Sequence, residues 1–135
     1  MSNDVTFLSP KSMHEPRGYS HAAKFGAGSV LFIAGQVPLD GSGKLVGSGD
    51  FRAQSQQVFA NLQAAVEAAG GRFRDIVKLN IYVTDVSKLG DYREVRDRYV
   101  DVDHPPTSTV VQVAALFRPE FMIEVEAVAA LPTVK

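Results

Sequence analysis

Apolar side chains recur every three to four residues between the glycine-rich segment DGSGKLVGSGD (40–50) and Gly70-Gly71. This spacing predicts an amphipathic helix that begins after Asp50 and packs one face against a core. The Asp50 carboxylate can accept a hydrogen bond from a free amide of the first turn, and the glycine pair ends the helix. The inward positions are Phe51, Val58, Phe59, Leu62, Ala65, Val66 and Ala69.

The next segment, IVKLNIYV (76–83), alternates between apolar and polar residues. Alternation with a period of two predicts a strand whose buried side is covered by the first helix. A second helix is expected from about Ser87 to Val100. It cannot continue through Pro105 and Pro106, because proline lacks an amide hydrogen and restrains the residue before it. The inward residues of these two elements are Val77, Leu79, Ile81, Val83, Leu89, Tyr92, Val95 and Tyr99.

The remaining apolar stretches predict strands at both ends of the chain. TSTVVQVAAL (107–116) and FMIEVEAVAAL (121–131) are expected to be two strands joined around FRPE. YSHAAKF (19–25) and SVLFIAG (29–35) are expected to pair through a turn at Gly26–Gly28. Strands, helix, strand, helix and strands in this order predict the α+β class. One sheet carries both helices on one face, in a single domain over residues 1–135.

The sheet face away from the helices combines carboxylates with apolar residues. Glu124 and Glu126 point to the same side of the last strand, away from Ile123, Val125 and Ala127. Apolar residues are expected beside the glutamates and beside Ser108 on the neighbouring stretch. A monomer can leave such a face in water, but a mixed apolar face is typical of a surface buried by another subunit. The residues in question are Met122, Val128, Val110 and Ala114.

Composition narrows the possible partners and compartment. The 135 residues contain 14 Lys and Arg against 15 Asp and Glu, so no basic field favours nucleic acid. The chain has no cysteine, which excludes disulfides and thiolate chemistry. The N-terminus has no apolar core of a signal peptide, and no run approaches the roughly 18 apolar residues of a membrane span. A cytoplasmic protein without nucleic-acid or membrane partners is expected.

Most motifs that would carry chemistry are incomplete. GSGK (41–44) lacks the Ser or Thr and the spaced glycine of a phosphate loop. His14, His21 and His104 lie far apart in the sequence and predict surface or loop positions, with no metal site. Ser108 follows no nucleophile elbow. Glu124 and Glu126, about 7 Å apart along a strand, are compatible with a carboxylate pair, with one glutamate that holds water, or with an interface salt bridge.

Several stretches together resemble the Rid family, the reactive intermediate deaminases, also known as YjgF-like proteins and often described as endoribonuclease L-PSP. The resemblance runs from about Tyr19 to Leu131. It is carried by YSHAA (19–23), LFIAGQVPLD (31–40), QSQQVFANLQAAVEAAGG (54–71), IVKLNIYVTD (76–85) and IEVEAVA (123–129).

The resemblance implies a chorismate-mutase-like α+β fold and a homotrimer whose sheets form an inner barrel. Ligand clefts would lie between neighbouring subunits. It also implies hydrolysis of small imines or enamines, such as 2-iminobutanoate, to ammonia and a 2-oxo acid, without a cofactor. The implied partners are a small molecule and two further copies of the chain.

The same resemblance assigns roles to particular residues. Tyr19 matches the cleft tyrosine, the segment 34–36 (Ala34, Gly35 and Gln36) matches an SGQ-type segment, and Glu124 matches the glutamate that positions water. Ser108 stands where imine-hydrolysing members carry the arginine that grips the substrate carboxylate. Arg96 stands at a cleft position that is usually asparagine.

Loss of that arginine changes the expected activity. Two charge-assisted hydrogen bonds are worth about 2–4 kcal/mol, so 2-imino acid hydrolysis should be weak or absent unless another cation substitutes. Arg96 and Arg118 are the candidates; the alternatives are a solvated helix residue for Arg96 and a hairpin surface charge for Arg118. The remaining functional possibilities are an enzyme for a different imine or enamine, a trimer that binds a metabolite without turning it over, and an endoribonuclease.

Overall fold

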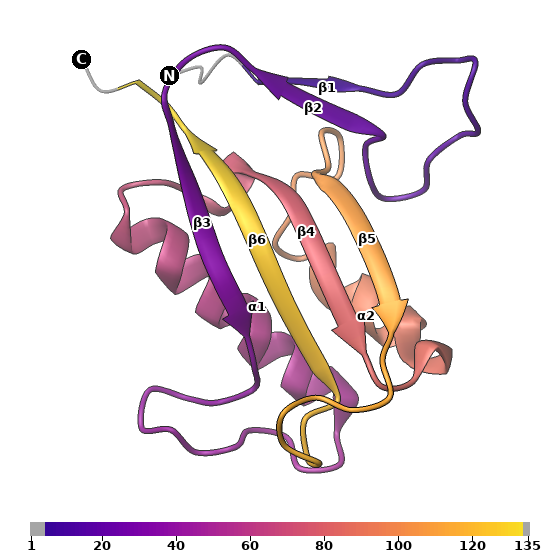
Figure 1. Ribbon diagram of the computed structural model, residues 1–135, viewed down its shortest axis with the longest axis vertical. Coiled ribbons are helices and arrows are strands. Elements are labelled where there is room, and N and C mark those ends of the chain that lie inside the picture. Colours follow the sequence, from indigo (N-terminus) through magenta and orange to yellow (C-terminus); the bar gives the residue numbers. More distant parts are fainter. Residues whose placement is uncertain (1–4, 134–135) are drawn as a thin grey trace.

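Four strands form a mixed sheet with the spatial order β3, β6, β4, β5 (Figure 1). The computed structural model describes residues 5–133. The pair β4 and β5 is parallel, and the other neighbouring pairs are antiparallel. These strands are β3 (Ser29–Gln36), β6 (Ile123–Leu131), β4 (Ile76–Val83) and β5 (Thr107–Gln112).

Both helices lie on one face of this sheet, as predicted (Figure 1). They are α1 (Phe51–Ala68) and α2 (Leu89–Arg96). The Asp50 carboxylate caps α1 by accepting a hydrogen bond from the amide of Ala53 at 3.1 Å. Gly70, with a φ of 84°, follows its end. The α+β class and the first helix are therefore confirmed.

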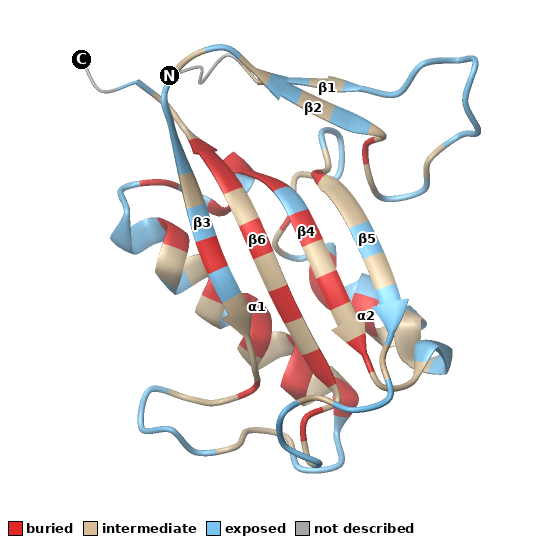
Figure 2. Cartoon of the chain, viewed as in Figure 1, coloured by how far each residue is buried: buried red, intermediate tan, exposed pale blue. Residues whose placement is uncertain are grey.

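The core lies between the helices and the sheet. Alternate residues of β4 and β6 are buried, which gives the red and tan bands of Figure 2. The α1 side chains that meet them lie four residues apart and are fully buried. Each large apolar side chain removed from water in this way contributes about 1.5–3 kcal/mol. The central members are Val58, Leu62, Val66, Leu79, Ile81, Ile123 and Val125.

The second helix is shorter than predicted. A 3₁₀ turn, η2 (Val86–Lys88), precedes α2, which ends at Arg96 and not at Val100. The amides of Tyr99 and Val100 both donate to the Arg96 carbonyl, at 2.9 and 3.0 Å, and this shared acceptor tightens and closes the last turn. Tyr92 and Val95 are buried as expected.

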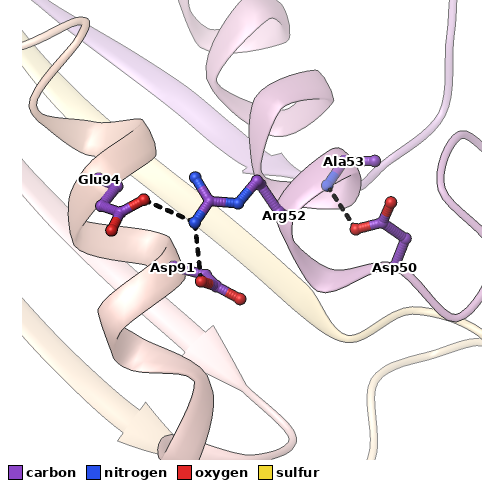
Figure 3. A network of polar contacts seen from close by, with 5 residues as sticks. All are labelled: Asp50, Arg52, Ala53, Asp91 and Glu94. Atoms are coloured by element: carbon purple, nitrogen blue, oxygen red, sulfur yellow. Dashed lines mark hydrogen bonds and ion pairs between the residues drawn. The ribbon is translucent and has the colours of Figure 1, made fainter.

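One arginine ties the two helices together at their exposed side (Figure 3). Nη2 of Arg52 on α1 donates to Oδ1 of Asp91 at 2.9 Å and to Oε2 of Glu94 at 2.6 Å, both on α2. The three side chains are partly or largely exposed, so this network orients α2 more than it stabilises the fold.

The predicted pairing of residues 19–25 with 29–35 is wrong. β2 (Ala22–Phe25) pairs with β1 (Val5–Leu8), a strand that the pattern did not predict, in a separate ribbon (Figure 1). β3 pairs with β6. Gly28 has a φ of 98° and packs on the carbonyl of Leu131, leaving no room for a side chain. A local turn signal marks where the chain bends, but it does not choose the partner strand.

The predicted hairpin between residues 107–116 and 121–131 is also wrong, because β4 lies between β5 and β6. The connection 113–122 crosses the end of β4. The amide of Val113 donates to the carbonyl of Val83 at 2.8 Å, and the amide of Thr84 donates to that of Met122 at 3.1 Å. β4, α2 and β5 instead form a βαβ unit, which places its two parallel strands side by side.

Candidate functional site

Glu124 and Glu126 lie on the open face of the sheet, the face without helices, as predicted. Glu126 accepts hydrogen bonds from Asn80 Nδ2 at 3.0 Å and Tyr82 Oη at 2.8 Å. These bonds hold the pKa of the Glu126 carboxyl below its usual value. Asn80 and Tyr82 were not singled out from the sequence, although their alternation with apolar residues on β4 places them on this face.

Glu124 has the opposite environment. Burial, followed by the charge of Glu126, raises the pKa of its carboxyl. Among residues 5–133 no group donates a hydrogen bond to it. Two carboxyls whose pKa values are pushed apart suit different tasks. Glu126 is a fixed anion, and Glu124 is the group able to accept and return a proton.

A β-bulge brings the 34–36 segment to Glu124. The register of β3 against β6 shifts between Ile33 and Gln36, and the Gln36 side chain donates to the carbonyl of Ala34 at 3.0 Å. A Cβ on Gly35 would overlap Oε2 of Glu124 and lie 2.9 Å from its Cδ. The carboxylate therefore rests on the backbone of Gly35, and only glycine allows this approach.

Two amides on α1 hold the segments that surround Glu124. Asn61 Nδ2 donates to the carbonyls of Val37 and Leu39, at 3.1 and 3.0 Å, just beyond β3. Gln54 is completely buried and bonds the connection that leads into β6. The sequence contained a signal that was missed: Gln54 lies four residues before Val58, so a polar residue occupies the inward stripe.

Ser108 does not share the face of the glutamates, contrary to the sequence-based expectation. It pairs with Leu79, whose side chain is buried in the core, so Ser108 points toward the helices. Val110 likewise packs against the core. Tyr82 on β4 pairs with Glu124 of β6 on one side and with Val111 of β5 on the other. Val111 lies three residues beyond Ser108 on β5. Ser108 is therefore displaced from the level of Glu124 by roughly 10 Å along the strand, and the two side chains lie on opposite faces of the sheet.

Arg96 is buried and is not a solvated helix residue. Its side chain is 9% exposed. Nε and Nη2 both lie 2.9 Å from Oδ1 of Asp97, and Cζ lies 5.9 Å from the centre of the Tyr92 ring. A Cβ on Gly18 would overlap Nη2 of Arg96, so the guanidinium lies directly against the Gly18 backbone.

The Tyr92 hydroxyl completes this group. Burial raises the pKa of Tyr92 above its usual value, whereas Arg96 and Ser108 oppose that rise. The Ser108 side chain is near enough to the Tyr92 hydroxyl to lower its pKa, but the two side chains do not form a hydrogen bond of good geometry. Tyr92 Oη is thus a buried polar atom without a hydrogen bond among the described residues. Such an atom normally costs stability unless a partner arrives.

Tyr19 is fixed next to the start of β5. The amide of the following residue, Ser20, donates to the carbonyl of Pro106 at 3.1 Å, and its hydroxyl donates to that of Pro105. Tyr19 Oη lies 2.7 Å from Nε2 of His14, whose ring meets that of His21 at 4.6 Å between centroids. The two histidines lie in a surface segment as predicted, but their contact was not foreseen.

Arg118 lies in the connection 113–122, with its side chain 47% exposed. Its Nη1 is 3.9 Å from Oε1 of Glu120, and its guanidinium lies 5.4 Å from the Phe121 ring centre. It therefore matches the surface charge that the sequence left open, although on a crossover connection and not on a hairpin.

Comparisons with known proteins agree with this architecture. A family model described as endoribonuclease L-PSP matches residues 10–131. The chain belongs to the Rid family. It is 37% identical over 111 residues to the RutC family protein PH0854 of Pyrococcus horikoshii. The aligned region covers 82% of this chain and 85% of that protein.

Solved Rid structures share the fold. The conserved Rid family protein YyfB of Yersinia pestis superposes with a TM-score of 0.86 at 35% identity, over 95% of this chain and 99% of that chain. TdcF of E. coli, solved with bound serine, has a TM-score of 0.67 at 28% identity, over 90% and 92% of the two chains.

In this Rid protein the predicted site residues other than Arg118 form two groups, one on the open face of the sheet and one at β5, where Ser108 points to the helix-covered face. The open-face group is Glu124 with the bulge 34–36; the β5 group is Tyr19, Arg96 and Ser108. A single copy does not bring the two groups together.

No helix within residues 5–133 is long and apolar enough to cross a membrane.

Proposed function

We propose that this single-domain Rid protein hydrolyses, without a cofactor, the C=N bond of a small imine or of the imine tautomer of an enamine. Members of the family are generally imine or enamine deaminases. The observation that carries the proposal is the Glu124 carboxylate, which lies over Gly35 with a raised pKa and no hydrogen bond among the described residues. In its ionised form it can hold a water molecule and take its proton.

The proposed reaction balances with water alone. Oxygen of the water attacks the imine carbon, while Glu124 accepts a proton. The carboxyl returns this proton to the nitrogen, which gives a carbinolamine. The proton of the carbinolamine hydroxyl then passes to the nitrogen through Glu124, the C–N bond breaks, ammonia leaves, and the carbon becomes the carbonyl of a 2-oxo product. Backbone groups of the Ala34–Gly35 bulge lie beside the carboxylate and can orient the nitrogen.

The direct test measures ammonia. The protein is incubated with freshly generated 2-iminobutanoate and with enamines such as aminomuconate, and ammonia release is compared with buffer. Faster release from at least one compound supports the proposal. No release from any of them contradicts it.

A metabolite-binding trimer without turnover is the second candidate, and Ser108 in place of an arginine favours it. TdcF, a relative, was solved with bound serine. A binder would melt at a higher temperature with 2-oxo acids or amino acids present, yet release no ammonia. An endoribonuclease is disfavoured by the net charge of −1, and RNA binding with a steep salt dependence would favour it instead.

The proposed enzyme requires more than one copy, and we propose a homotrimer. The two groups of site residues face away from each other across the sheet, so a neighbouring chain must bring its β5 group to the open face. Exposed apolar side chains on that face provide a surface for the contact. They are Val30, Phe32 and Val111, exposed by 45%, 79% and 41%.

Replacing Phe32 with glutamate should dissociate the assembly. Phe32 borders a hollow of about 440 Å³ that Glu126 also lines. On association, a glutamate at position 32 would lose its contact with water close to the Glu126 carboxylate, and this burial of two like charges opposes assembly. Sedimentation at micromolar concentration should show trimers for the parent protein and monomers for Phe32→Glu. Ala64→Glu, on the exposed side of α1, is the matched control and should remain trimeric. A monomeric parent protein contradicts the assembly.

The pH profile should report the raised pKa of Glu124. Activity requires the ionised carboxylate, so the rate should fall as pH drops through a pKa above that of an ordinary glutamate. Because the charge of Glu126 contributes to this rise, Glu126→Gln should move the acid limb of the kcat/KM profile to lower pH. If the acid limb of Glu126→Gln stays at the same pH as in the parent protein, ionisation of Glu124 does not control the rate.

A further inference from the structure

Three ring side chains in the connection between β1 and β2 form a cluster around the Tyr19 hydroxyl. Nε2 of His14 lies 2.7 Å from Oη of Tyr19, a hydrogen-bond distance. The His21 ring meets the rings of His14 and Tyr19 edge-on, at 4.6 and 5.5 Å between centroids. Edge-to-face contact is a preferred arrangement of rings at such distances. The Tyr19 hydroxyl is therefore held beside one particular histidine nitrogen.

The backbone is fixed on both sides of Tyr19. Gly18 lies directly against the guanidinium of Arg96 on α2, at a φ of 78°. Ser20 is buried and donates to the carbonyls of Pro105–Pro106, where the connection from β1 to β2 reaches the edge of β5 (Figure 1). With the backbone and the ring both held, the main variable left to the Tyr19 side chain is the direction of its hydroxyl hydrogen.

His21 fixes the backbone that carries His14. Nε2 of His21 lies 2.7 Å from the carbonyl oxygen of His14. A carbonyl oxygen only accepts, so Nε2 of His21 carries the hydrogen of this bond. The amide of His21 in turn donates to Oγ of Ser9, just after β1, at 3.3 Å. This bonding ties His14 to the end of β1 and leaves its own Nε2 to Tyr19.

The bond between His14 and Tyr19 can run in either direction. A hydroxyl has one hydrogen and two lone pairs; a neutral imidazole nitrogen can accept, whereas both nitrogens of a protonated ring only donate. When Nε2 of His14 accepts, the phenolic hydrogen is used within the pair. When Nε2 donates to the phenolic oxygen, that hydrogen is free for a third group. His14 thus decides whether Tyr19 can donate to a ligand.

The charges around His14 are of both signs. Lys11 and Glu15 line the same surface hollow as His14, and the His21 ring lies on another side of it. Tyr19 is the remaining titratable group in contact with the ring. Histidine is the residue type whose charge ordinarily changes between about pH 5 and 8. Protonation is therefore able to set the direction of the bond.

We propose that His14 is a positioning residue for Tyr19. The protonated ring donates to the phenolic oxygen and so directs the Tyr19 hydrogen to an acceptor atom of the substrate, such as the lone pair of an imine nitrogen. A hydrogen bond there draws electron density away from the carbon that water attacks. The inference rests on the proposed function, because Tyr19 belongs to the β5 group that a neighbouring copy brings to Glu124.

A double-mutant cycle on ammonia release tests this role. His14→Phe keeps a ring but removes the bond, and should lower kcat/KM about threefold to tenfold, as for the loss of one hydrogen bond. Tyr19→Phe should lower it at least as much. Adding His14→Phe to Tyr19→Phe should have no further effect, because His14 acts only through Tyr19. Independent losses that multiply in the double variant overturn the proposal. His104→Phe, a histidine outside the cluster, is the matched control and should stay within about twofold of the parent protein.

The pH profile of kcat/KM gives a second readout, which a merely structural role would not change. The rate should fall as pH rises through the titration of His14, since the neutral ring can take the phenolic hydrogen. His14→Phe should lack this alkaline limb and keep the acid limb of Glu124. Because the profile compares each protein with itself, a smaller folded fraction of His14→Phe does not alter the result. An unchanged alkaline limb in His14→Phe overturns the proposal.

NMR of the histidine ring nitrogens examines the pair without a substrate. Tyr19→Phe should move the Nε2 signal of His14, which is identified by its loss in His14→Phe; a signal that does not move overturns the pair. Ammonia release with independent losses in the cycle overturns the role of His14 and leaves the hydrolase intact. A moved Nε2 signal without ammonia release from any imine supports the pair and overturns the hydrolase.

Discussion

Replacing Glu124 with glutamine will lower kcat/KM for imine hydrolysis by about 10²–10⁴-fold, the usual contribution of a positioned general base. The amide keeps the shape of the side chain but cannot accept the proton of water. The parent carboxyl has a raised pKa, which means that the folded protein binds this proton more tightly than the unfolded chain does. Ionisation of Glu124 therefore lowers the free energy of unfolding at pH values above the folded-state pKa. This loss of stability is absent at pH values below the pKa of Glu124 in the unfolded chain. The variant should be at least as stable as the parent protein at neutral pH.

The control for this prediction is Glu126→Gln, on the same face two residues away. Glu126 is already engaged by Asn80 and Tyr82, so its loss should change the rate by less than the loss of Glu124 does. Ammonia release under saturating and limiting imine, with unfolding curves for each variant, separates the two effects. Equal rates for Glu124→Gln and the parent protein would remove Glu124 from the reaction.

Replacing Gln54 with leucine will destabilise the protein by about 2–4 kcal/mol, through buried groups left without partners. The Gln54 amide donates to the carbonyls of Gly47 and Glu120, at 3.0 and 2.9 Å, and accepts from the amide of Met122 at 2.8 Å. Leucine has a similar volume but satisfies none of these groups. The loss should also loosen the entry into β6, two residues before Glu124.

Urea unfolding measures this effect directly. Gln56→Leu is the matched control, because Gln56 lies on the same helix but is only partly buried. Its effect should stay within about 0.5 kcal/mol, as for ordinary surface substitutions. If both variants unfold at the same urea concentration, the Gln54 bonds contribute nothing to stability.

The candidate site could be predicted only in part from the sequence. The resemblance assigned the AGQ segment and Glu124 of IEVEA to the same cleft, and the structure places Gly35 against Glu124. Residues whose role depends on a distant partner were harder to find. Tyr82 acquires its importance from Glu126, which is 44 residues away, and this contact leaves no local pattern.

The helix after Asp50 and the alternation of residues 76–83 could be predicted because they depend on interactions between residues a few positions apart. Strand pairing depends on which distant segments meet, and periodicity contains no such information. Only the tertiary structure placed β4 between β5 and β6, paired β2 with β1, and turned Ser108 toward the helices. Since side chains alternate along a strand, the register of β5 against β4 decides which face each residue takes. Together with the register of β6 against β4, it places Ser108 on the helix-covered face and Glu124 on the opposite face.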